Sequence, residues 1–275
     1  MQTLLELLAS FWQIWSHMLI LDVGRYLVAA GGLALILKLF WNAGLKFRKI
    51  QARFASNDDV RREILASLRS GIIFSLNGVA IAYAAMHGIV TVYLDFERAG
   101  TGYLAISVAA MILAHDTYFY WTHRLMHLPR LYPYFHRTHH RSVTPTAFAA
   151  YAFDVPEAVL MAAFTPLWLL LVPMHGLGLF LFMAFMIIRN VMGHAGVELM
   201  PRRLADSRWF GWINSTTHHD LHHATFHYNY GLYFTWWDRL MGTEHPAYRE
   251  KLRGAPDHDA AAAADSAARP AVAAS

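Results

Sequence analysis

The chain has 275 residues, of which 56% are hydrophobic and only 15% are charged, and its formal net charge is +4. A soluble domain usually carries about a quarter of charged residues, so this composition argues against a water-soluble globule, and the small charge argues against a nucleic-acid-binding protein. The sequence has no cysteine, which excludes disulfides, thiolate zinc sites and a cysteine-bound iron–sulfur cluster in this chain.

Apolar runs of membrane-spanning character follow one another along the chain. Residues 4–21 either cross the membrane or lie at its interface; no basic region precedes them and no cleavage site follows, so we do not interpret them as a removable signal. The spans predicted after this segment are, in order, residues 26–41, 71–94, 103–121, 155–172 and 176–191. The last two form a tight helical pair.

The composition between these runs divides the chain into four parts. Residues 1–45 are N-terminal membrane segments, 46–70 a basic connection, 71–253 a domain of membrane and polar segments, and 254–275 an alanine-rich tail that we expect to be disordered. The connection contains seven Lys or Arg residues, which places it in the cytoplasm by the positive-inside rule. Counting the spans forward brings the histidine-rich segments to the same side.

Histidines gather in the second half of the chain, where 13 of the 17 lie between His115 and His227. Three clusters have the patterns HxxxH or HxxHH: His123 and His127; His136, His139 and His140; and His219, His222 and His223. Since residues three and four apart share a helix face, each pattern directs its imidazoles into one small volume. Imidazole binds iron, zinc, copper and nickel, and eight convergent imidazoles suit two ions better than one tetrahedral ion. The isolated histidines are expected to be structural: His17, His87, His175, His245 and His258.

Four ordered segments resemble the fatty acid hydroxylase/sterol desaturase superfamily of membrane di-iron oxygenases. They are residues 115–127 (HDTYFYWTHRLMH), 132–158 (YPYFHRTHHRSVTPTAFAAYAFDVPEA), 193–201 (GHAGVELMP) and 218–243 (HHDLHHATFHYNYGLYFTWWDRLMGT). The resemblance implies nine metal ligands, namely His123, His127, His136, His139, His140, His194, His219, His222 and His223. It also implies two iron ions, dioxygen as a co-substrate, and the hydroxylation or desaturation of a lipid.

Two positions depart from the pattern of this superfamily. Some members have a histidine four residues before the equivalent of His194, where this chain has Asn190. Relatives often have His-Pro where this chain has Asp154 and Val155. The sequence therefore leaves open whether the lipid is a sterol, a fatty acyl chain or a carotenoid.

Three acidic residues could hydrogen-bond to the ring nitrogens of the ligand imidazoles that do not face the metal. Asp116 lies within about 20° of both His123 and His127 on a helical wheel, so it could accept the second N–H of a ligand imidazole, or it could pair with Arg124. Glu198 and Asp220 are similar candidates. His115 and His218 could also join the site, and His227 is expected at the surface.

The fold expected from these observations is all-α: a polytopic membrane helical bundle with a cytoplasmic, histidine-rich helical cap that holds a dinuclear metal site. The chain lacks cysteines and a GxGxxG nucleotide motif, and it has no spare length for a fused haem domain. We therefore expect an external electron donor, a ferredoxin or a cytochrome b5-type protein, to dock at the basic cytoplasmic face.

Two other functions compete with a lipid oxygenase. An intramembrane zinc hydrolase would use zinc, which imidazole also binds, but the sequence has no HExxH motif and nine ligands exceed one zinc site. A non-enzymatic metal transporter or sensor usually places its polar ligands within the spans near the midplane of the membrane, whereas these histidines lie at the ends of spans.

Overall fold

The computed structural model describes residues 4–205 and 207–254, and most of them are helical. The longer helices are α1 (Leu4–Leu39), α2 (Asn57–Met86), α3 (Gly100–Met126), α6 (Val155–Leu169), α7 (Gly176–Gly193) and α9 (Thr216–Thr225). The shorter ones are α4 (Tyr132–Phe135), α5 (Arg137–His140), α8 (Arg202–Ala205), α10 (Trp236–Leu240) and α11 (Tyr248–Gly254), with 3-10 turns η1 (Leu45–Arg48), η2 (Phe96–Arg98) and η3 (Ala147–Tyr151). The predicted tail, residues 255–275, lies outside the described residues, as does His258.

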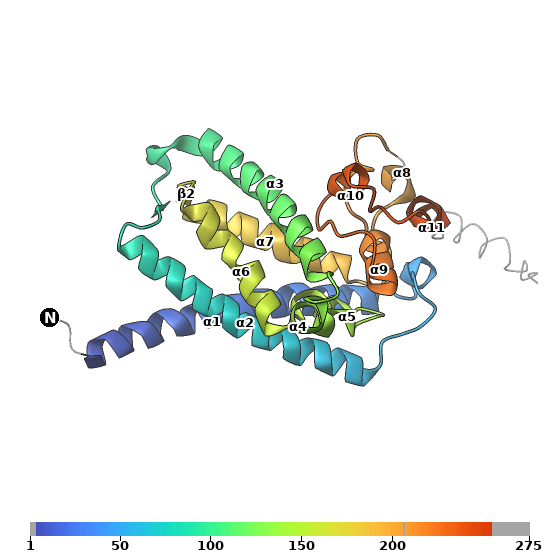
Figure 1. Cartoon of the computed structure of the whole chain (residues 1–275), viewed down its shortest axis with the longest axis horizontal. Coiled ribbons are helices and arrows are strands. Elements are labelled where there is room, and N and C mark those ends of the chain that lie inside the picture. Colours follow the sequence, from blue (N-terminus) through green and yellow to red (C-terminus); the bar gives the residue numbers. More distant parts are fainter. Residues whose placement is uncertain (1–3, 206, 255–275) are drawn as a thin grey trace, which may run out of the picture.

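The long helices form one bundle, and the short helices of the C-terminal part form a cap at one end of it (Figure 1). In the described part of the chain, three helices are long and apolar enough to cross a membrane: Leu8–Leu39 in α1, Asn57–Met86 in α2, and α7. Helix α3 packs against α7, and α6 packs against α2 and α3. The chain is therefore a membrane protein with a helical bundle and a cap, as the sequence predicts.

The N-terminal membrane region differs from the prediction. Residues 4–21 and 26–41 are not two segments, because α1 runs through both without a break. The charged residues between the two predicted segments, Asp22 and Arg25, form an ion pair one helical turn apart. This pair satisfies the charges within a continuous helix.

The basic connection contains the start of the next membrane helix. Helix α2 begins at Asn57, inside the predicted connection, because Ser56 and Asp59 form a capping box: the Ser56 hydroxyl accepts the Asp59 N–H, and the Asp59 carboxylate accepts the Ser56 N–H. The preceding loop contacts the cap, where Arg48 donates to the Met200 carbonyl at 2.6 Å. The basic connection and the cap therefore lie at the same end of the molecule.

The opposite end of the bundle is closed by a small feature that an all-α prediction does not include. Strands β1 (Val92–Tyr93) and β2 (Met174–His175) form a two-residue parallel pair that ties the loop after α2 to the loop after α6. The His175 ring contacts the Leu94 carbonyl oxygen at 2.9 Å and accepts the N–H of Leu177 at the start of α7. This isolated histidine is structural, as expected.

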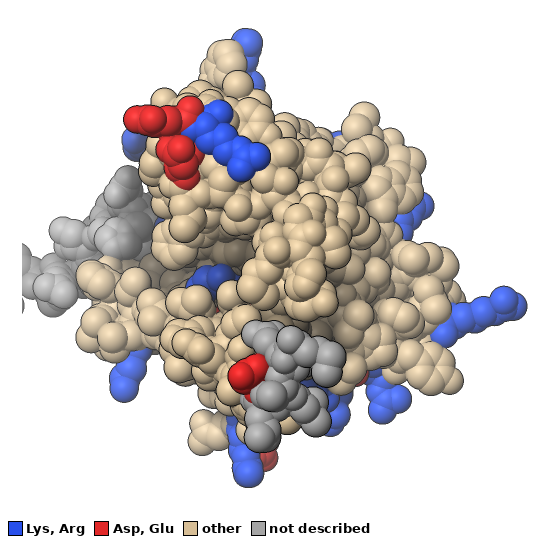
Figure 2. All heavy atoms as spheres, turned by 90° about the vertical axis from the view of Figure 1, so that its left-hand side faces the viewer, with Lys and Arg blue, Asp and Glu red and all other residues tan. Residues whose placement is uncertain are grey.

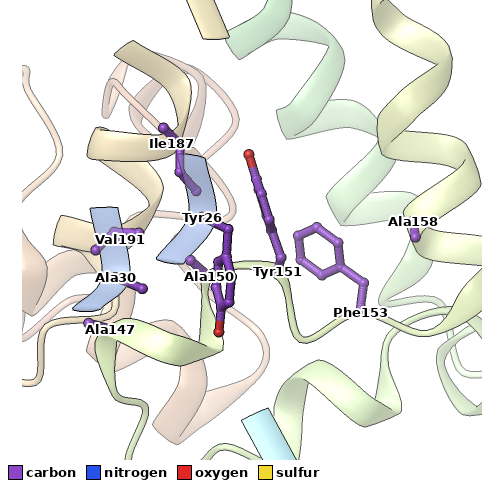
Figure 3. Close-up of a cluster of buried hydrophobic side chains, with 9 residues drawn as sticks. All are labelled: Tyr26, Ala30, Ala147, Ala150, Tyr151, Phe153, Ala158, Ile187 and Val191. Atoms are coloured by element: carbon purple, nitrogen blue, oxygen red, sulfur yellow. The ribbon is translucent and has the colours of Figure 1, made fainter. Parts of the chain in front are cut away.

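A cluster of buried apolar residues fixes η3 between the membrane helices and the cap (Figure 3). It joins residues from α1, η3, α6 and α7: Tyr26, Ala30, Ala147, Ala150, Tyr151, Phe153, Ala158, Ile187 and Val191. The rings of Tyr26 and Tyr151 stack at 5.9 Å, and the Tyr26 hydroxyl donates to the Phe148 carbonyl at 2.9 Å. Phe153 belongs to this cluster, and the centroid of its ring lies 5.3 Å from that of the His139 ring. The packing of the cluster therefore helps to position the histidine site.

Candidate metal centre

The nine histidines named from the sequence lie in two adjacent groups. We call His123, His127, His136, His140 and His222 the first histidine group, and His139, His194, His219 and His223 the second histidine group. Within each group, the candidate ligand atoms all lie within 4.8 Å of one another. Eight of the nine side chains are buried, and His127 is half-buried.

Each HxxHH pattern contributes histidines to both groups. This corrects the expectation that all the imidazoles of one pattern point into the same small volume. His139 and His140 are neighbours on α5, so their side chains point about 100° apart and enter different groups. On α9, His222 joins the first group while His219 and His223 join the second. The two groups adjoin, since the ring centroids of His140 and His223 are 4.9 Å apart.

Hydrogen bonds on the outer ring nitrogens set the tautomers of three members of the first histidine group, His123, His136 and His222. The Nδ1 of His123 lies 2.8 Å from the Tyr230 carbonyl oxygen, and the Nδ1 of His222 lies 2.7 Å from that of Tyr228. A carbonyl oxygen can only accept, so each Nδ1 carries the hydrogen and each Nε2 keeps a free lone pair. His136 donates its Nδ1 hydrogen to the Glu157 carboxylate at 2.7 Å, with the same result.

These lone pairs point at one another. The Nε2 atoms of His123 and His136 are 2.9 Å apart, and those of His127, His140 and His222 form a triangle with sides of 3.0, 3.1 and 3.2 Å. No hydrogen is available between two unprotonated nitrogens, so the His123–His136 contact is not a hydrogen bond. A cation about 2.0–2.1 Å from each nitrogen, with angles of about 90–105° between ligands, produces this spacing. The donor set therefore fits a metal ion.

In the second histidine group, His194 has the same kind of outer hydrogen bond. The Nδ1 of His194 donates to the Asn190 carbonyl at 2.8 Å, which leaves its Nε2 free at the end of α7. That nitrogen lies 2.9 Å from the Nε2 of His219 and 3.3 Å from those of His139 and His223. Four nitrogens with this spacing fit a second ion with room for an exchangeable ligand.

Burial keeps these imidazoles uncharged. Desolvation is the largest cause of each pKa shift. It lowers the pKa of His194 to about 4 and holds the pKa values of six other histidines well below 6.5. The neighbouring imidazoles lower several of these pKa values further. The six are His136, His139, His140, His219, His222 and His223. The rings are therefore neutral near pH 7, the form that binds metals.

Asp116 does not have the contact predicted for it. Its carboxylate accepts the backbone N–H of Tyr233 at 2.8 Å and the indole N–H of Trp236 at 2.7 Å. It does not pair with Arg124 either, whose guanidinium donates to the Tyr120 hydroxyl. The helical wheel shows the angle of a side chain around the helix axis but not its position along that axis. Asp116 and His123 have similar angles, but their separation of seven residues corresponds to about 10 Å along the axis. Asp116 instead anchors the segment that follows Tyr230.

Glu198 and Asp220 contact the backbone and other side chains near the second histidine group. Glu198 accepts the N–H of Thr217 at 2.8 Å and thereby holds the first turn of α9. Asp220 accepts from the Gln51 amide at 2.9 Å, which ties α9 to the basic connection, and burial raises its pKa to about 6. Both carboxylates therefore position the helix that bears three candidate ligands.

The carboxylate that does contact a candidate ligand was missed. Glu157 lies at the start of α6, and its side chain, like that of its partner His136, is only 2% exposed. A signal was present in the sequence, because Glu157 is the one charged residue in the apolar run 155–172.

The remaining histidines near the site lie outside the two groups. His115 contacts the Tyr233 hydroxyl at 2.9 Å, and His218 lies 3.5 Å from the Asp238 carboxylate, so neither joins the candidate ligands. His227 is exposed, as expected.

Comparisons with known proteins agree with the motifs. Residues 108–243 match the family model described as fatty acid hydroxylase. The chain is 33% identical over 192 residues to a Delta(7)-sterol 5(6)-desaturase of Gibberella zeae, covering 70% of this chain and 57% of that protein. It is 30% identical over 196 residues to the lathosterol oxidase of Rattus norvegicus, covering 69% and 63%. The chain thus spans less than two thirds of the length of these relatives. No solved structure matches it.

Proposed function

Since the chain belongs to the fatty acid hydroxylase/sterol desaturase superfamily, we propose that it is a membrane di-iron oxygenase that hydroxylates or desaturates a lipid. The names of its relatives point to a sterol as that lipid. The observation that carries the proposal is the convergence of unprotonated Nε2 atoms in two adjacent groups, which is unfavourable without cations.

We assign all nine histidines as metal ligands, five to one iron and four to the other. When bound, the two irons would activate dioxygen for the removal of hydrogen from an unactivated C–H bond. The protein residues keep the ligand rings neutral and oriented, and Glu157 contributes a negative charge behind His136 that the imidazoles themselves lack. Asp116, Glu198 and Asp220 act as positioning residues for the segments that carry or contact the ligands.

A cavity in the membrane bundle gives a lipid access to this site. Its volume is about 190 Å³, and residues of α1, α2, α3, α6 and α7 line it. Two of its lining residues touch candidate ligands: the Phe119 ring is 4.9 Å from that of His123, and the Phe153 ring is 5.3 Å from that of His139. A lipid entering from the bilayer need not move its apolar surface through water, which would cost about 25 cal/mol per Å².

We place the cap and its histidines on the cytoplasmic side. The basic connection, whose Lys and Arg residues favour the cytoplasm, lies at the same end as the cap. The electrons would come from an external ferredoxin or cytochrome b5-type protein that docks at this basic end.

Metal and product analysis of the full-length protein tests the proposal. The purified protein should contain two irons, and membranes supplied with the sterol lathosterol and ¹⁸O-labelled dioxygen should form either a labelled alcohol or a product lighter by two hydrogens. His222→Ala and His219→Ala, one from each histidine group, should abolish turnover, whereas the exposed His227→Ala should retain it. A single zinc ion, or full turnover in either site variant, would contradict the assignment.

A further inference from the structure

The cavity beside the metal site contains a pair of opposite charges. Asp22 and Arg25 of α1 both line it, and a guanidinium nitrogen of Arg25 contacts a carboxylate oxygen of Asp22. Figure 2, which views the end of the molecule opposite to the cap, shows a largely uncharged face with a central hollow and a Lys or Arg side chain inside the hollow. Asp22 and Arg25 therefore belong to the lining of the cavity in the membrane bundle.

A charged side chain at this depth in the membrane has a high desolvation free energy unless a partner or a ligand compensates for it. The pair lies near the middle of the apolar stretch Leu8–Leu39. Ionisable residues within membrane spans commonly mark binding sites or pathways. Mutual pairing explains part of the arrangement, but the Arg25 Nε is buried without a hydrogen-bond partner among the described residues. The side chains of Asp22 and Arg25 are 13% and 24% exposed, so the pair keeps polar surface for a ligand.

The chemistry of the pair selects one kind of polar group. A guanidinium offers donors and a carboxylate offers acceptors, and a hydroxyl group can use both at once. A carboxylate would be repelled by Asp22, and a pure hydrocarbon would leave both charges desolvated and unused. We propose that Asp22 and Arg25 bind the hydroxyl group of the lipid substrate; this assignment rests on the proposed function and names its substrate class as a lipid alcohol.

The surroundings of the pair predict how that lipid lies. The Arg25 guanidinium is close to the Tyr151 hydroxyl, the Tyr151 and Phe153 rings are 6.1 Å apart, and Phe153 contacts His139 of the second histidine group. Met18, which also lines the cavity, lies seven residues before Arg25, about 10 Å along α1 and away from the cap. The hydroxyl end of the lipid is thus directed toward the histidines, and its apolar remainder extends outward.

Equilibrium binding to the full-length protein in detergent tests the assignment without requiring turnover. The probes are two matched pairs: lathosterol with its 3-deoxy analogue, and hexadecanol with hexadecane. The test variant is Asp22→Asn/Arg25→Gln, which removes both charges and leaves neutral polar side chains in their place. The control is Asp59→Asn/Arg62→Gln, which removes an ion pair of the same spacing from the cap end of α2, outside the cavity lining.

Wild type and control should bind the alcohol of at least one pair about tenfold more tightly than its hydrocarbon, as one hydrogen bond to a charged group allows. The Asp22/Arg25 variant should lose most of this preference, because its neutral amides form weaker hydrogen bonds to a hydroxyl than charged groups do. Equal binding by wild type in both pairs, no binding of either alcohol, or an unchanged preference in the Asp22/Arg25 variant would each overturn the assignment. A clear preference without any oxidation would instead contradict only the proposed function.

Discussion

Glu157 offers the sharpest test of how the protein supports its metal ligands. Its carboxylate accepts the Nδ1 hydrogen of His136 at 2.7 Å, and both side chains are buried. Removing such an outer partner usually weakens metal binding by about 10- to 100-fold, or about 1.4–2.7 kcal/mol. We expect Glu157→Gln to lie near the lower value, because its amide oxygen can still accept from His136, and Glu157→Ala to lie near the upper value.

The assay is the amount of iron that the full-length protein retains as the concentration of a chelator rises. Glu63→Gln is the matched control, since Glu63 is also a fully buried carboxylate on a membrane helix, but it accepts a hydrogen bond from Thr146 instead of an imidazole. The chelator curve should move for both Glu157 variants and stay in place for the control. An unmoved curve in Glu157→Ala would refute the supporting role of this carboxylate.

Three further predictions concern stability. Burial lowers the pKa of His194 from 6.5 to about 4, so the unfolded chain binds more protons than the folded chain below pH 6.5. The stability of the metal-free protein, measured by thermal unfolding, should therefore fall from pH 6.5 toward pH 4. A rise in stability over this range would contradict the prediction. Gly231→Ala places a Cβ 2.5 Å from the Phe234 carbonyl oxygen, so we expect a loss of about 1–3 kcal/mol, whereas Gly102→Ala, with no described atom within 4 Å, should be tolerated. Ser56→Ala removes the capping box of α2 and should cost about 1 kcal/mol in the same assay while lipid oxidation continues.

The spacing of the histidines predicted eight of the nine residues that gather, and the family resemblance added His194, but neither predicted how the nine divide between the two groups. Residues three or four apart share a helix face, so the clusters were visible in the sequence. The assignment of His139 and His140 to different groups depends on how α5 sits between α3 and α9, which is a property of packing. Hydropathy likewise did not predict that α1 is one helix, because the charged residues Asp22 and Arg25 lie inside it and pair with each other.

The residues behind the ligands were harder to predict. Asp116 shares a wheel direction with His123, yet it lies too far along the helix to reach it. Glu157 and His136 are 21 positions apart and belong to different elements, and the backbone carbonyls of Asn190, Tyr228 and Tyr230 carry no sequence signal at all. Contacts of this kind arise from the fold as a whole.

The central claim is that the nine imidazoles hold two irons, and anomalous X-ray scattering at the iron edge from crystals of the full-length protein tests it most directly. The account predicts two peaks, one surrounded by the first histidine group and one by the second. A single peak, or iron bound elsewhere while these rings remain empty, would contradict it.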